Sequence, residues 1–256
     1  MKKTLALLNL TSVVLVIAVN YTSQALRLNG TTIGDISRKY DNLFTPASYA
    51  FAIWGIIFLS LVAYGIFQIH RAFFSSKESG FIEKTGYWFF IANVLNAAWV
   101  FAFVYDYTGL SVFIMLGILF ALVKIILNTN MERRNAPIGI VVFVWWPISI
   151  YAGWIAVATI ANIAAYLTKI GWDGSFLSPA SWTVIMIAIA VVLNLIVLWK
   201  RNLREFAFVG VWALFAIYSR HKTSYEAIAY SALVGVGILA LCTVFHAFMN
   251  RKTKAL

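Results

Sequence analysis

Long apolar runs, interrupted only by short polar connectors, constrain most strongly how this chain can fold. A transmembrane helix needs about 20 mostly apolar residues. Apolar residues make up 62% of the chain and charged residues only 11%, and a water-soluble core of this size cannot bury such an excess. The sequence therefore predicts an all-α polytopic membrane protein with eight spans. These spans are Leu5–Asn20, Pro46–Ile69, Tyr87–Tyr105, Leu110–Leu127, Ile138–Leu167, Ser181–Trp199, Phe206–Tyr218 and Ala227–Met249.

The first and seventh of these segments leave alternatives open. The first begins with Lys2 and Lys3 before an apolar run, as a signal peptide does. No small-x-small cleavage site closes that run, so we favour a retained helix. The seventh segment, Phe206–Tyr218, is the shortest. It is either a tilted span that extends to Glu205 and Arg220 or a re-entrant segment.

The distribution of Lys and Arg predicts the orientation. With the N-terminus inside, the inner side holds Lys2, Lys3, Arg71, Lys77, Lys84, Lys124, Arg133, Arg134, Lys200, Arg201, Arg204, Arg251, Lys252 and Lys254. The outer side then holds Arg27, Arg38, Lys39, Lys169, Arg220 and Lys222. Cytoplasmic loops carry the excess of Lys and Arg, so we expect both termini in the cytoplasm, in a bacterial inner membrane. The net charge of +11 is thus assigned to orientation in the lipid bilayer and not to a nucleic-acid partner.

Ionisable groups lie in connectors and at span ends. The nine acidic residues are Asp35, Asp41, Glu78, Glu83, Asp106, Glu132, Asp173, Glu205 and Glu226. Proton-driven transporters usually keep such groups inside the membrane, and acid–base catalysis needs them paired. His70, His221 and His246 lack metal-ligand spacing, Cys242 is the single cysteine, and no Gly-rich phosphate loop is present. We expect no metal, no cofactor and no catalytic site.

Neutral polar and aromatic side chains remain inside the spans. Asn96 and Trp99 share one helical face, and Trp154, Ala158 and Asn162 form a stripe because they are spaced by four. An amide in hydrocarbon needs a partner. That partner is either a facing helix, the commoner case, or a ligand.

A proline in the fifth segment provides a second hint of a binding site. Pro147 removes a backbone hydrogen bond and is expected to kink the helix. The resulting gap between neighbouring helices could form a pocket. Since small-molecule pockets are mostly apolar with few polar anchors, a flat, aromatic, poorly soluble ligand would fit such a lining.

Two motifs support this interpretation. The residues from Trp154 to Asn162 read W-I-A-V-A-T-I-A-N, and those from Leu95 to Trp99 read L-N-A-A-W. They resemble the W-x-x-x-A-T-x-x-N and L-N-x-x-W patterns of the TspO/MBR family, the tryptophan-rich sensory proteins that include the translocator protein.

A third stretch is similar to the pattern P-x-x-x-F-x-x-x-W-x-x-L-Y of the same family. The spacing from Pro46 to Trp54 matches. Phe51 lies one position late, and Phe58 stands where Tyr is usual. This stretch is therefore less specific than the first motif.

The resemblance covers residues 1–168 and implies a five-helix bundle. It implies that residues 28–45 form a lid over a ligand pocket, although a solvated connector is the alternative for this loop. Family ligands include porphyrins and, in animal members, cholesterol and synthetic drugs. By resemblance, the pocket is lined by Trp54, Asn96, Trp99, Tyr151, Trp154 and Asn162.

Residues 169–256 add three spans that compact family members lack. They could cover part of the bundle, form a homodimer surface or carry a separate activity. We therefore predict two domains, a TspO/MBR-like five-helix bundle over residues 1–168 and a three-helix transmembrane extension over residues 169–256.

The predicted function is that of a membrane receptor, sensor or carrier. It would bind a flat hydrophobic molecule, such as a tetrapyrrole (porphyrin) or a sterol-like molecule, within the helix bundle. The alternatives are a transporter or permease subunit for neutral hydrophobic solutes and a non-catalytic membrane scaffold. An enzyme that modifies a bound lipid or pigment ranks last, since no nucleophile–base pair is visible.

Overall fold

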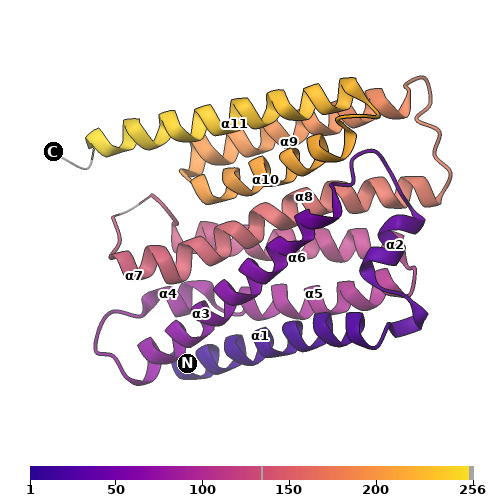
Figure 1. The fold of residues 1–256 in the computed structure, drawn as a ribbon. Coiled ribbons are helices and arrows are strands. Elements are labelled where there is room, and N and C mark those ends of the chain that lie inside the picture. Colours follow the sequence, from indigo (N-terminus) through magenta and orange to yellow (C-terminus); the bar gives the residue numbers. More distant parts are fainter. Residues whose placement is uncertain (134, 254–256) are drawn as a thin grey trace.

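The computed structural model describes residues 1–133 and 135–253. Two of the predicted inner cations, Arg134 and Lys254, lie outside these residues, and the side chains of Arg251 and Lys252 are not described. All regular structure in the described part is helical (Figure 1). The helices are α1 (Lys2–Ala25), α2 (Ile33–Lys39), α3 (Ile53–Phe73), α4 (Gly80–Thr85), α5 (Trp88–Val104), α6 (Thr108–Thr129), α7 (Ile138–Ile140), α8 (Trp146–Lys169), α9 (Pro179–Arg201), α10 (Arg204–His221) and α11 (Glu226–Thr253).

Six helical segments of the described chain are long and apolar enough to cross a membrane. They are Lys2–Ala25, Ser48–Phe73, Thr108–Thr129, Ile138–Lys169, Pro179–Arg201 and Glu226–Met249. Helix α5 is apolar but has only 17 residues, and α10, with 18 residues, is not among the six. The prediction of a polytopic helical membrane protein is therefore confirmed, while the count of eight spans stays a prediction.

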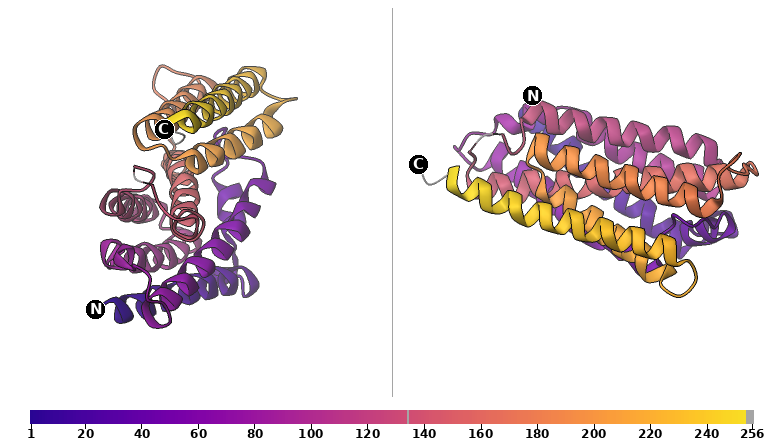
Figure 2. Two further views of the ribbon diagram at one scale, coloured as in Figure 1. Left: turned by 90° about the vertical axis from the view of Figure 1, so that its left-hand side faces the viewer. Right: turned by 90° about the horizontal axis from the view of Figure 1, so that it is seen from above.

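The long helices form two groups and run roughly along one direction, except for α3, which crosses its neighbours obliquely (Figures 1 and 2). Helices α1, α3, α5, α6 and α8 form the larger group, in which α5 packs on both α1 and α6. Helices α9, α10 and α11 form the smaller group, and α10 joins it to α8. Helix α1 begins and α11 ends at the same end of the bundle (Figure 1).

Polar side chains fix α1 inside the larger group. Asn9 on α1 donates a hydrogen bond of 2.8 Å to Gln68 on α3, and Asn93 on α5 donates one of 3.0 Å to Ser12 on α1. Bonds of this kind join helices where no water competes for the polar groups. They also give each of these buried amides one hydrogen-bond partner, although Asn9 Oδ1, Gln68 Nε2 and Asn93 Oδ1 have none within the described residues.

The fifth predicted segment is irregular where Pro147 was expected to disturb it. The turn Val141–Trp145 is π-helical, and α8 continues from Trp146 with Pro147 in its first turn. Pro147 has no N–H to donate to the carbonyl four residues earlier. A π-helical turn just upstream accommodates that missing hydrogen bond.

The two groups meet most closely where α8 faces α10. A Cβ atom added to Gly153 would lie 3.1 Å from the carbonyl oxygen of Phe206 and from the Cβ of Val209. The smaller group therefore packs on the larger one with the backbone of α8 at Gly153 close to the backbone of α10 at Phe206. The boundary predicted between residues 168 and 169 stays a prediction.

Candidate ligand-binding site

The connection between α1 and α3, residues 26–47, is a folded segment that we call the lid segment. It contains α2, whose N-terminus is a capping box. In that box the Thr32 hydroxyl accepts from the N–H of Asp35 at 3.1 Å, and the Asp35 carboxylate accepts from the N–H of Thr32 at 2.9 Å. These bonds, followed by the charges of Arg27 and Arg38, lower the pKa of Asp35. The lid segment thus has internal structure of its own.

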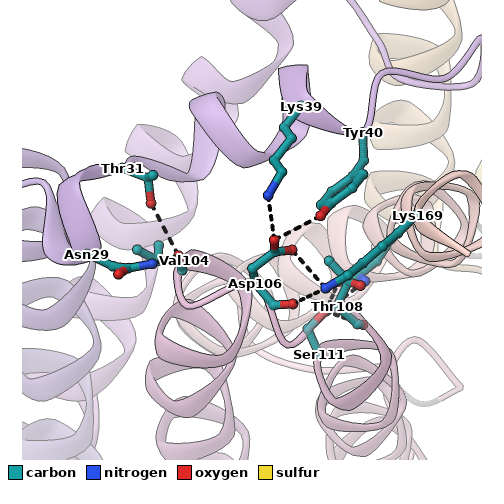
Figure 3. A network of polar contacts seen from close by, with 10 residues as sticks. Asn29, Thr31, Lys39, Tyr40, Val104, Asp106, Thr108, Ser111 and Lys169 are labelled. Atoms are coloured by element: carbon teal, nitrogen blue, oxygen red, sulfur yellow. Dashed lines mark hydrogen bonds and ion pairs between the residues drawn. The ribbon is translucent and has the colours of Figure 1, made fainter.

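One edge of the lid segment is bound to the α5–α6 connection through Asp106 (Figure 3). Lys39 and Tyr40 donate to Asp106 Oδ2 at 2.6 Å and 2.8 Å, and Lys169 at the end of α8 donates to Oδ1 at 3.0 Å. Partial burial alone would raise the pKa of Asp106, but the hydrogen bonds from these three residues outweigh it and lower that pKa. Asp106 therefore holds the lid segment as a carboxylate.

The opposite edge of the lid segment is bound to the end of α10. Arg220 donates to both carboxylate oxygens of Asp41 at 2.7 Å, and also to the carbonyl oxygens of Asn42 and Thr45 at 3.0 Å and 2.7 Å. A planar guanidinium is suited to such a set of acceptors. Residues of the predicted three-helix extension thus help to position the lid segment.

A large cavity opens between the lid segment, α1 and α3, and we call it the lid cavity. Its volume is about 1070 Å³. Its wall combines apolar and aromatic side chains with polar and charged ones. The lining residues are Ile17, Asn20, Tyr21, Gln24, Ile33, Gly34, Ser37, Arg38, Asp41, Thr45, Pro46, Ala47, Ser48, Phe51, Trp54, Phe58 and Arg220.

A smaller cavity of about 60 Å³, the deep cavity, continues from the lid cavity toward α5, α6 and α8. The two cavities share Ile33, Ser37, Thr45, Pro46, Phe51 and Trp54. The deep cavity is otherwise lined by Trp99, Phe103, Met115, Trp154, Val157, Ala158, Ala161, Asn162 and Ala165. The rings shared by both cavities therefore form a boundary that a flat ligand could cross or displace.

Four of the six residues predicted to bind the ligand line one or both of these cavities, while their role in binding stays a prediction. Trp54 lies at the boundary of both cavities, and Trp99, Trp154 and Asn162 line the deep cavity. The indole ring of Trp154 contacts Trp54 edge-to-face with ring centroids 6.4 Å apart. The indole N–H of Trp154 is buried and has no hydrogen-bond partner within the described chain. A buried donor of this kind is costly unless something accepts from it.

The other two predicted residues lie behind this lining. Asn96 donates to the hydroxyl of Tyr151 at 2.8 Å and accepts from Asn20 at 3.2 Å. The ring of Tyr151 packs behind Trp54, with 6.1 Å between the ring centroids. Neither Asn96 nor Tyr151 lines the lid cavity or the deep cavity. They link α1, α5 and α8 and support the Trp54 ring.

The Asn162 amide is already bonded to neighbouring helices. Its oxygen accepts from Trp99 Nε1 at 2.7 Å and its Nδ2 donates to Ser111 on α6 at 2.9 Å. This arrangement corresponds to the structural role that a buried amide most often has. Asn162 therefore fixes the orientation of Trp99 against the deep cavity.

Sequence reasoning missed the polar groups at the edge of the lid cavity. Asn20 is the last residue of the predicted first span, Gln24 lies on the part of α1 that extends beyond it, and Ser37 and Arg38 lie on α2. The capping signal of Thr32 and Asp35 could have revealed α2, since Thr followed three residues later by an acidic residue is typical of a helix start.

The dependence of the lid segment on Asp106 gives a testable expectation. The pKa of Asp106 lies below its usual value of 3.8, so the carboxylate contribution is complete above about pH 4 and is lost as the pH falls further. We expect hydrogen exchange of α2, corrected for its intrinsic pH dependence, to stay slow from neutral pH down to about 4. We expect Asp106→Asn to accelerate it at pH 7.

Asp173→Asn, in the connector between α8 and α9, is the matched control for this experiment. Within the described residues the Asp173 carboxylate accepts only from the backbone N–H of Ser175 in its own loop, so its loss should leave α2 unchanged. Unaltered exchange of α2 in Asp106→Asn would show that Asp106 does not hold the lid segment.

The comparison with protein families matches nearly the whole chain. The family model described as TSPO-like protein matches residues 6–245. The matched range includes both cavities, the lid segment and most of the three-helix group. No curated protein and no solved structure gives a significant match.

Proposed function

The chain belongs to the TSPO-like protein family, and from this membership we propose that it is a receptor, sensor or carrier for a flat hydrophobic molecule. The family and the six apolar helices establish an integral, multi-pass membrane protein. They also support a ligand-binding or sensing role in the membrane. The finer proposal is a tetrapyrrole such as a porphyrin, or a sterol-like molecule, bound beneath the lid segment.

The aromatic boundary between the two cavities carries this proposal. Trp54 stacks on Phe58 with centroids 5.2 Å apart and an interplanar angle of 24°. Phe51 meets Trp154 edge-to-face at 5.9 Å. Aromatic faces of this kind bind flat ring systems by stacking and edge contacts. The lid cavity, at about 1070 Å³, reaches the upper end of the range for small-molecule pockets.

Two polar features define what such a ligand should carry. The unpartnered indole N–H of Trp154 favours a ligand with a hydrogen-bond acceptor near the ring system. Arg38, on the wall of the lid cavity, favours a negative group at the solvent edge of the ligand. A planar, mostly apolar molecule with peripheral carboxylates combines both features.

The proposed location is a bacterial cytoplasmic membrane with both termini inside. The excess of Lys and Arg on that side of the chain supports this orientation. The lid segment and its contacts with Asp106 and Arg220 would then face the outer side. A ligand would enter from that side or from the outer leaflet.

The test is a titration of the purified protein with protoporphyrin IX, followed by the absorbance of the porphyrin. This readout does not depend on how many tryptophans the variant contains. We expect saturable binding to the wild type. Trp154→Phe keeps an aromatic ring but removes the N–H donor, so we expect binding roughly tenfold weaker, the effect of losing one hydrogen bond.

Trp88→Phe is the matched control. Trp88 contacts Phe120 at 5.6 Å and lines neither cavity, so binding should be unchanged. Binding that is lost equally in both variants, or that never saturates in the wild type, would contradict the proposed pocket. Asn162→Ala is unsuitable here because it would also break the bonds to Trp99 and Ser111.

A further inference from the structure

A third cavity lies at the end of the bundle where α1 begins and α11 ends, away from the lid segment. We call it the terminal-end cavity. Its volume is about 310 Å³. It lies between the π-helical turn before α8, the first turns of α10 and the second half of α11. The lining residues are Glu132, Val141, Trp146, Arg204, Glu205, Phe208, Thr243, Val244 and Ala247.

Three polar atoms on the wall of this cavity are buried without a hydrogen-bond partner in the described chain. They are Arg204 Nε, Glu205 Oε2 and Thr243 Oγ1. A buried polar group left unpaired costs about 1–3 kcal/mol. A cation, a carboxylate and a hydroxyl in one small cavity therefore indicate a polar ligand.

Thr243 is the most specific of the three. It is only 2% exposed, and a buried threonine within a helix usually donates to the carbonyl four residues earlier. Five other threonines in this chain make that bond, namely Thr22, Thr129, Thr159, Thr168 and Thr183. The hydroxyl of Thr243 makes no such bond and remains available to a molecule in the cavity.

The same cavity is bordered by side chains that face lipid. Phe208 is 58% exposed and Val244 is 51% exposed, on helices of a membrane protein, where exposed apolar side chains contact acyl chains. The indole of Trp146 is also partly exposed, and tryptophan is enriched at the level of lipid headgroups. A ligand here would thus have a polar head beside Arg204 and an apolar tail along Phe208.

We propose that the terminal-end cavity binds the headgroup of a membrane phospholipid that carries a primary ammonium group, as in phosphatidylethanolamine. The phosphate would accept from Arg204 and Thr243, because guanidinium and hydroxyl groups are donors suited to phosphate. The ammonium would donate to Glu205. A choline headgroup has no N–H to donate, so the carboxylate distinguishes the two zwitterionic lipids. This site is independent of the lid cavity and of its proposed ligand.

Native mass spectrometry of the delipidated protein tests this proposal. Phosphatidylethanolamine, phosphatidylcholine and phosphatidylglycerol with identical acyl chains are each added. We expect one phosphatidylethanolamine to be retained with an affinity roughly tenfold above that of phosphatidylcholine, the effect of one charged hydrogen bond. Equal retention of all three, or a preference for phosphatidylglycerol, would overturn the proposal. Glycerophosphoethanolamine, the soluble headgroup, should bind far more weakly, and equal binding would show that the occupant is not a lipid.

Substitution of one hydroxyl by a methyl group locates the site. Thr243→Val is expected to weaken retention of phosphatidylethanolamine roughly tenfold. The thermal stability of the lipid-free protein should not fall, because the Thr243 hydroxyl has no hydrogen-bond partner within the described residues. Thr183→Val on α9, a buried threonine that donates to Pro179 at 2.8 Å, is the control and should leave lipid retention unchanged. Unchanged retention in both Thr243→Val and Arg204→Gln would place any bound lipid elsewhere and overturn the assignment.

Discussion

Replacing Arg220 by glutamine is expected to release the lid segment from the three-helix group. Arg220 is the donor for both oxygens of Asp41 and for two backbone carbonyls, and its side chain is 24% exposed. Loss of these charged hydrogen bonds should reduce the free energy that holds the lid segment on α10 by about 2 kcal/mol. This corresponds to a roughly thirtyfold rise in the population with an open lid segment.

Hydrogen exchange of the backbone around Asp41 to Thr45 measures this opening directly. The rate of porphyrin dissociation should rise in proportion to the open population, because the lid segment covers the lid cavity. Arg220→Lys keeps the charge but cannot donate to all four acceptors, so we expect an intermediate effect. Lys222→Gln, on the same turn but exposed, should change neither rate. Equal exchange in Arg220→Gln and wild type would mean that the other contacts of the lid segment, which include Asp106 and the bond between His221 and the Leu43 carbonyl oxygen, hold it without Arg220.

Long apolar runs made the larger elements predictable. The segment expected over Leu110–Leu127 is α6, Thr108–Thr129, and the segment expected over Ser181–Trp199 is α9, Pro179–Arg201. Length and hydrophobicity decide such elements locally. Membership in the TSPO-like family was likewise predictable, because its motifs lie within single helices.

The spacing of Trp154 and Asn162 also placed both residues on one wall of the deep cavity. Helical periodicity shows which residues share a face, but it does not show which neighbouring helix meets that face. Asn96 was expected in the pocket for the same reason as Trp99, yet its amide is bonded to Asn20 and Tyr151. The difference depends on how α1 and α8 pack around α5.

The attachment of the lid segment could not be predicted from local sequence. Asp41 and Arg220 are separated by 179 positions, and each looks like an ordinary loop charge. Their pairing requires α10 to end beside the lid segment, and this depends on tertiary packing. The count of eight spans stays a prediction for a related reason, since α5 and α10 are too short or too polar to be assigned by hydropathy alone.

Gly153→Ala should produce a large loss of stability. The new Cβ would lie 3.1 Å from the Phe206 carbonyl oxygen and 3.2 Å from its Cα, and backbone atoms cannot rotate out of the way. Helices α8 and α10 would have to shift by a few tenths of an ångström, at an expected cost of about 1–3 kcal/mol, which the higher helix propensity of alanine offsets by about 1 kcal/mol. Thermal unfolding in detergent micelles measures this loss as a lower midpoint temperature.

Gly237→Ala on α11 is the matched control, because nothing lies within 4 Å of the added Cβ. Alanine is the better helix former by about 1 kcal/mol, so this variant should be neutral or slightly stabilised. The two substitutions make the same chemical change with opposite expected signs. A midpoint that does not fall in Gly153→Ala would mean that the contact between α8 and α10 is loose. Because α10 also carries Arg220, Gly153→Ala should in addition accelerate exchange of the lid segment. That second effect would show that packing in the membrane core controls access to the ligand cavity.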